Sequence, residues 1–127
     1  MPLPDNDESY LRERGLAYEA AVDANMTCVV LAGYKLPEGY DHAEADLLLR
    51  LSPGYPDIPP DMWWLSPAIK LADGRTIRAT ETEESHLGRN WQRWSRHLDG
   101  GQWLPGRDSL ESYLALIDQE FRKQEPA

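Results

Sequence analysis

The chain is poor in cysteine and contains no long apolar run. Cys28 is the only cysteine among 127 residues, so an internal disulfide and a cysteine-based zinc cluster are both excluded. No stretch approaches the roughly eighteen consecutive apolar residues of a membrane-spanning helix. The N-terminal residues 1–5 are acidic and lack the apolar segment of a secretion signal. We therefore expect a cytoplasmic protein that has no membrane partner.

Basic residues are also scarce. The chain has 13 Lys and Arg against 22 Asp and Glu, for a net charge of -9. Nucleic-acid binding requires a basic surface, so a nucleic-acid partner is not expected. His42, His86 and His97 are scattered without the paired spacing of metal ligands, and no glycine-rich phosphate loop follows a strand. The sequence predicts neither a metal nor a cofactor.

The residues that are present indicate one globular domain over residues 1–127. Hydrophobic residues make up 41% of the chain, enough for a core at this length. Apolar and polar side chains alternate over residues 45–51, as in a half-buried strand. The expected fold is α+β: an N-terminal helix, an antiparallel four-stranded meander and a C-terminal helix. The predicted elements are a helix ending at Arg14, strands over residues 19–22, 26–35, 45–51 and 62–65, and a helix over residues 109–123.

The final helix has the clearest pattern. Asp108 is the expected N-cap, and Glu111 three residues later completes a pattern like a capping box. One apolar stripe follows at helical spacing and is expected to be core: Leu110, Tyr113, Leu114, Ile117 and Phe121.

Ser95-Arg96-His97 is the sharpest candidate site. A serine hydroxyl needs a base to become a nucleophile, and His97 is the nearest candidate, with His86 a second. Residues two apart diverge in a strand, so Ser95 and His97 can meet only if this stretch is irregular. A local basic patch surrounds Ser95; it is either a solvated loop or a docking site for an acidic partner or a carboxylate. Its residues are Arg89, Arg93, Arg96 and Arg107.

Two motifs bracket this cluster and carry a resemblance. Tyr55-Pro56-Asp57-Ile58-Pro59-Pro60 follows the predicted third strand, and Gln102-Trp103-Leu104-Pro105 precedes the final helix. Together they resemble the signature of the ubiquitin-conjugating enzymes (E2, the UBC-like superfamily), and the chain is most similar to the divergent prokaryotic E2-like family E. In the superfamily a catalytic cysteine lies eight residues before the tryptophan, and here that position holds Ser95. The resemblance also makes Pro59–Pro60 the first candidate for a cis bond in the turn.

The resemblance implies a function in a bacterial ubiquitin-like conjugation pathway, and it associates the chain with antiviral defence. Its partners would be a ubiquitin-like protein and a ThiF-type activating enzyme, and Ser95 would accept the ubiquitin-like C-terminus as an oxyester. His97 would be the base, and Asn90 or backbone N–H groups would be the oxyanion donors. The expected partner-binding residues are Arg93, Arg96, Trp94 and Trp103.

Three alternatives remain open at this stage. The same fold could be a non-catalytic scaffold that binds the ubiquitin-like protein or its activating enzyme, because the histidine-proline-asparagine motif of the family is not recognisable. Ser95 could also be an engineered replacement of a natural cysteine. Finally, the chain could be an unrelated adaptor whose two motifs match by chance. The five tryptophans are expected to be mostly core.

Overall fold

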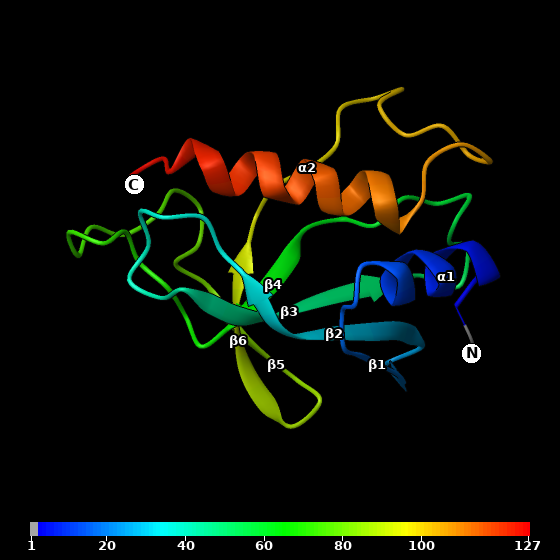
Figure 1. Ribbon diagram of the computed structural model, residues 1–127, viewed down its shortest axis with the longest axis horizontal. Coiled ribbons are helices and arrows are strands. Elements are labelled where there is room, and N and C mark those ends of the chain that lie inside the picture. Colours follow the sequence, from blue (N-terminus) through cyan, green and yellow to red (C-terminus); the bar gives the residue numbers. More distant parts are fainter. Residues whose placement is uncertain (1–2) are drawn as a thin grey trace.

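Six strands form one antiparallel sheet in the computed structural model, which describes residues 3–127. The strand order is β1-β2-β3-β4-β6-β5. Both helices lie on the same side of this sheet (Figure 1). The elements are α1 (Asp5–Glu13), β1 (Tyr18–Asp23), β2 (Met26–Lys35), β3 (Glu44–Leu51), β4 (Trp63–Ser66), β5 (Glu83–His86), β6 (Arg89–Trp94) and α2 (Leu110–Lys123). Across residues 3–127, no helix has the length and apolar character needed to cross a membrane.

Strands β1 to β4 form the meander that the sequence predicts. Each pairs with the next in antiparallel register. The first hairpin turns at Ala24 and Asn25, whose φ angles of 51° and 62° are the positive pair that a tight two-residue turn requires. The expected α+β class, with its N-terminal helix and C-terminal helix, is confirmed.

The stretch before Ser95 differs from the prediction. Residues 83–94 form a hairpin, β5 and β6, and β6 pairs with β4 so that Trp94 lies opposite Trp63. The charged and amide residues of β6 gave no strand pattern in the sequence. Burial explains the strand, because Trp91 and Trp94 are fully buried on opposite faces of the sheet. The hairpin widens the expected four-stranded sheet to six.

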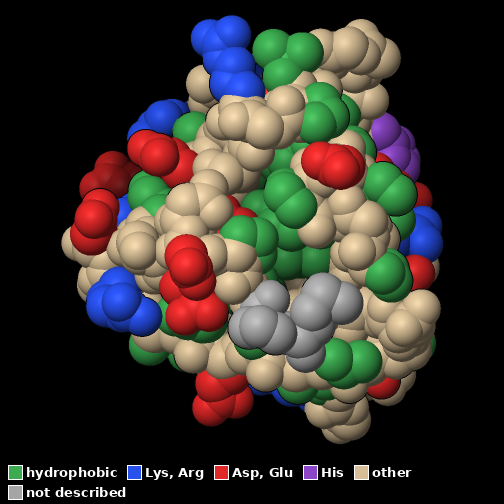
Figure 2. Space-filling view, turned by 90° about the vertical axis from the view of Figure 1, so that its right-hand side faces the viewer, with side chains coloured by type: hydrophobic (Ala, Val, Ile, Leu, Met, Phe, Trp, Pro, Cys, Tyr) green, Lys and Arg blue, Asp and Glu red, His purple; other side chains and the backbone are tan. Residues whose placement is uncertain are grey.

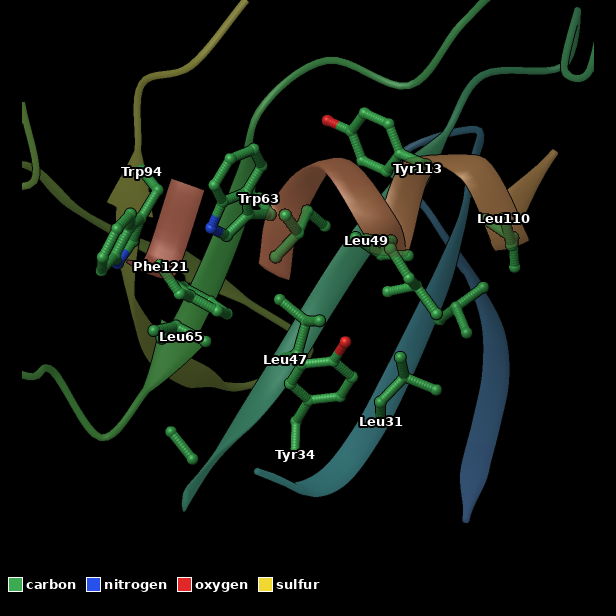
Figure 3. Packing of buried hydrophobic residues seen from close by; sticks show 14 of the residues in the cluster. Leu31, Tyr34, Leu47, Leu49, Trp63, Leu65, Trp94, Leu110, Tyr113 and Phe121 are labelled. Carbon is green, nitrogen blue, oxygen red and sulfur yellow. The ribbon is translucent and has the colours of Figure 1, made fainter. Parts of the chain in front are cut away.

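The apolar stripe of α2 is core, as predicted. All five of its residues are buried. Phe121 is the centre of an aromatic cluster, with ring centroids 5.1 Å from Trp94 and 6.2 Å from Trp63. Figure 3 shows Phe121 between α2 and the strands that carry these tryptophans. The helix is therefore fixed over the end of β6, where the candidate site begins.

The cap of α2 lies one residue later than predicted. Ser109 is the N-cap, and Ser112 completes a capping box with it. Asp108 instead accepts a hydrogen bond from the backbone N–H of Leu104 at 2.7 Å. The Asp108 carboxylate thus stabilises the loop before the helix, and the side chains of Ser109 and Ser112 cap the N-terminus of α2.

Residues 52–60 form the expected turn between β3 and β4, but the cis bond is at Tyr55–Pro56 and not at Pro59–Pro60. The indole N–H of Trp103 donates to the carbonyl of Pro56 at 2.9 Å, so the two signature motifs touch. Each motif leaves one large side chain exposed, Ile58 in the first and Leu104 in the second.

Figure 2 shows the side of the molecule on which α1 lies in Figure 1. Hydrophobic side chains gather near the middle of this face.

A second, smaller core lies on the opposite face of the sheet. It contains Cys28, Leu48, Trp64 and Trp91, all buried. Cys28 is a free thiol and is buried. Because Trp63 and Trp64 are neighbours in β4, the two faces of one strand supply both cores.

Leu114→Ala should lower the free energy of unfolding by about 2–5 kcal/mol, because it removes a fully buried side chain from the helix–sheet interface. The measurement is urea unfolding followed by tryptophan fluorescence. Leu104→Ala is the matched control and should change the free energy by less than about 0.5 kcal/mol, because Leu104 is exposed. Equal losses in the two variants would contradict this account of the core.

Candidate active site

Ser95 directly follows β6 and lies where three segments meet. Its backbone N–H donates to the carbonyl of Ala79 at 3.0 Å. The carbonyl of the next residue, Arg96, accepts from the N–H of Met62 at 3.2 Å. Ser95 is half-buried, and its position is set by the end of the sheet and by the loops on either side of it.

A polar cavity of about 420 Å³ opens beside Ser95 and is bounded by α2. Ser95, Arg96 and His97 all line it, so the structure brings the three residues of the sequence motif to one site. The charged residues of its lining are three basic and two acidic: Arg78, Arg96, Lys123, Asp99 and Glu120. The local excess of positive charge suits a carboxylate or an acidic segment, on a protein whose net charge is -9.

Arg96 lines this cavity and is buried. The residue is 8% exposed and its guanidinium lies 5.0 Å from the ring centroid of Trp94. Its Nε is 3.4 Å from Glu120 Oε1, an ion-pair contact without hydrogen-bond geometry. Burial lowers the pKa of Arg96, and the nearby charge of Arg78 lowers it further, whereas Glu120 opposes the shift. Arg96 is thus a cation with hydrogen-bonding capacity to spare.

His97 pairs with an aspartate that sequence reasoning missed. Its Nδ1 lies 2.7 Å from Asp61 Oδ1, and both side chains are exposed. An ionised carboxylate only accepts hydrogen bonds, so Nδ1 donates to Asp61, and in the neutral ring Nε2 is then the acceptor. Asp61 directly follows the proline turn, and only the folded chain brings it to His97.

The hydroxyl of Ser95 contacts an arginine and not a histidine. Arg93 Nε donates to Ser95 Oγ at 3.2 Å. In the part of the chain that the structure describes, neither His97 nor His86 forms a hydrogen bond with this hydroxyl. His86 lies in β5, where its Nε2 is 3.0 Å from Glu84 Oε1 and its ring packs edge-on against Trp64.

Glu84 joins these groups into one network. Its Oε2 accepts from Arg93 Nη1 at 2.8 Å, and its Oε1 accepts from Trp64 Nε1 at 2.9 Å. Burial alone would raise the pKa of Glu84, but hydrogen bonds from His86, Trp64 and Arg93 outweigh it and lower the pKa. Glu84 is not among the site residues that the sequence predicts. The alternation of β5, which places Glu84 and His86 on one face, is the signal that marks it.

Three of the expected site residues do not line the cavity beside Ser95. Asn90 is near the start of β6, five residues away, which corresponds to about 16 Å of extended strand. Trp94 is fully buried in the main core, so it cannot contact a partner directly. Trp103 is half-buried, with its ring 6.3 Å from those of Tyr55 and Tyr113.

The basic patch is divided by these contacts. Arg89 stacks on Trp91, with its guanidinium 4.4 Å from the ring, and pairs with Asp46 at 3.1 Å. It therefore belongs to the far end of β6 and not to the site. Arg93 and Arg96 remain as the two arginines in contact with Ser95, one through the hydroxyl and one through the backbone carbonyl.

The N-terminal helix, antiparallel sheet, proline turn and C-terminal helix define an E2-like α+β fold. The model of the family described as Prokaryotic E2 family E matches residues 3–124, and the chain belongs to this family. No curated protein and no solved structure matches the chain. Membership gives the chain an E2-like role in prokaryotic conjugation, and with it interaction with a ubiquitin-like protein and an activating enzyme.

Glu84→Gln should make the protein less sensitive to acid. The lowered pKa means that the carboxylate stabilises the fold above its ordinary pKa of 4.5, and that this contribution is lost as the pH falls through the lowered value. Urea midpoints measured between pH 7 and pH 3 should therefore fall less in the variant than in the wild type. Glu83→Gln is the matched control, since Glu83 is exposed in the same strand, and it should follow the wild type. Parallel curves for Glu84→Gln and wild type would refute the stabilising role of this network.

Proposed function

We propose that Ser95 is an acyl acceptor: it takes the C-terminal carboxyl of a ubiquitin-like protein from a ThiF-type activating enzyme and carries it as an oxyester. The observation that carries the proposal is the position of Ser95. It matches the place of the superfamily's cysteine in the motif order, and it lines a polar cavity together with His97, whose ring pairs with Asp61.

In this proposal His97 is the general base. Asp61 holds the ring through Nδ1, so that Nε2 takes up the hydroxyl proton through an intervening water as Ser95 Oγ attacks the acyl carbon. A water relay is required because His97 forms no direct hydrogen bond with Ser95 in the described residues. Backbone N–H groups, and not Asn90, act as oxyanion donors, since Asn90 lies several residues away along β6.

Charge and shape near the site support binding of the partners. Arg96 supplies positive charge in the cavity where the C-terminal segment of the ubiquitin-like protein would approach, and Arg93 supplies it at the Ser95 hydroxyl. Beside them, Trp103 lies next to exposed Leu104 and is hydrogen-bonded to the turn that exposes Ile58. These apolar side chains offer a contact surface for the activating enzyme.

Ser95→Ala should abolish the covalent adduct that forms with the cognate activating enzyme, the ubiquitin-like protein and ATP. The wild-type adduct should resist thiol reductants and be cleaved by hydroxide and hydroxylamine, as an ester is. Ser95→Cys should give an adduct that reductants cleave, because a thioester replaces the ester. Mass spectrometry of the modified peptide reads out each case.

Ser85→Ala is the matched control, because Ser85 is an exposed serine of the adjacent strand. It should form the adduct as the wild type does. An adduct that persists in Ser95→Ala, or no adduct in the wild type, would overturn the catalytic proposal. A non-catalytic scaffold that binds the ubiquitin-like protein or its activating enzyme would then be the function left to test.

A further inference from the structure

The group that touches the candidate nucleophile is the guanidinium of Arg93. Its Nε donates to Ser95 Oγ at 3.2 Å, and its side chain is 30% exposed. A guanidinium remains charged at every pH at which a protein is folded. Because it donates to the oxygen, it favours the negatively charged form of that oxygen over the neutral hydroxyl.

Arg93 is held in place from the neighbouring strand. Glu84 Oε2 accepts from Arg93 Nη1 at 2.8 Å, while Glu84 Oε1 receives the indole N–H of Trp64. The carboxylate is therefore anchored in β4 and β5 at the same time as it binds Arg93 in β6. This arrangement presents Nε to Ser95 and limits the rotation of the arginine side chain.

The second arginine of the site cannot do the same. Arg96 Nη1 donates to the backbone carbonyl of Ser95 at 3.3 Å, and its Nε faces Glu120. Arg96 therefore contacts the main chain and α2. Of these two arginines, Arg93 is the one whose guanidinium donates to the Ser95 hydroxyl.

We propose that Arg93 stabilises the Ser95 oxygen when that oxygen carries negative charge, and that Glu84 is the positioning residue for Arg93. This inference rests on the proposed acyl-acceptor function. It extends that function to both halves of the reaction, because the same oxygen is the attacking group when the ester forms and the leaving group when it is consumed.

The chemistry balances without a further reagent. In the forward step the acyl carbon of a thioester on the activating enzyme is attacked by Ser95 Oγ, the C–O bond forms and the C–S bond breaks. The hydroxyl proton ends on the departing thiolate. In the second step an amine displaces Ser95 Oγ, and the amine's proton returns to the alkoxide. An alkoxide is a poorer leaving group than a thiolate, and the hydrogen bond from Arg93 offsets part of that difference.

The test compares acylation of Ser95 in two assays. One measures oxyester formation with the cognate activating enzyme, the ubiquitin-like protein and ATP. The other measures acetylation of Ser95 by p-nitrophenyl acetate, which needs no partner, with exposed Ser85 as the internal reference. Removing one donor to a developing oxyanion costs about 100- to 1,000-fold in a closed site; for a partly exposed arginine we expect Arg93→Ala to slow both assays about tenfold.

Three comparisons separate this role from a structural one. Arg89→Ala removes the same charge from the same strand and should leave both rates within about twofold of wild type, since an exposed ion pair far from Ser95 adds little. Added guanidinium chloride, at concentrations below those that unfold the protein, should restore part of the rate in Arg93→Ala and none in Ser95→Ala. Glu84→Gln alone should lower both rates relative to the wild type. In the Arg93→Ala background it should lower neither rate further, because Glu84 acts on Ser95 only through Arg93.

The outcomes distinguish this inference from the proposed function. Ester formation on Ser95 that is unaffected by Arg93→Ala would overturn the inference and leave the function standing. Acetylation of Ser95 that depends on Arg93, without any adduct of the ubiquitin-like protein, would uphold the inference and overturn the function. If Ser95 in the wild type is acetylated no faster than Ser85, or if Arg89→Ala and Arg93→Ala slow the reaction equally, the inference is wrong.

Discussion

The packing of Phe121 against the sheet is the interaction on which the rest of the structure depends. Its ring contacts those of Trp63 and Trp94, and the tilted ring of Tyr34 lies 6.5 Å away. These partners come from β4, β6 and β2, so one side chain of α2 ties the helix to three strands. Because Trp94 immediately precedes Ser95, the same packing fixes the place where β6 ends and the candidate site begins.

At the N-terminal end of α2, a buried carboxylate connects the helix to α1 and to the proline turn. Asp7 in α1 is 1% exposed; it accepts the hydroxyl of Tyr55 at 2.7 Å and the backbone N–H of Leu110 at 3.0 Å. A negative charge is favourable at the N-terminus of a helix, and both oxygens are satisfied. The first helix, the proline turn and the start of α2 therefore share one buried group, and the tyrosine of the signature motif has a structural reason to be present.

The site combines rigid support with a polar opening. Trp94 and the strand pairing lie beneath Ser95, while Arg96, His97 and α2 border the cavity. Each charged or histidine side chain of the site has a partner: Asp61 hydrogen-bonds His97, Glu84 hydrogen-bonds Arg93, and Glu120 forms an ion-pair contact with Arg96. Such pairing is what a reactive centre needs, because a side chain whose orientation is fixed loses less entropy when it acts. Asp61 and Glu120 come from segments distant in sequence, and Glu84 comes from the neighbouring strand of the β5–β6 hairpin.

The sequence by itself determined the meander, the proline turn and the buried stripe of α2, because each follows from a local pattern of apolar spacing or proline. It misplaced the N-cap of α2 and the cis bond, where neighbouring residues offer similar local chemistry. Only the tertiary structure decided that residues 89–94 are a strand, since burial against β4 outweighs the poor strand pattern of Arg89, Gln92 and Arg93. It also decided which charged groups meet. Glu84 contacts Arg93, and Asp61 contacts His97, across separations of 9 and 36 residues, and no local pattern encodes a hydrogen bond between segments that only folding brings together.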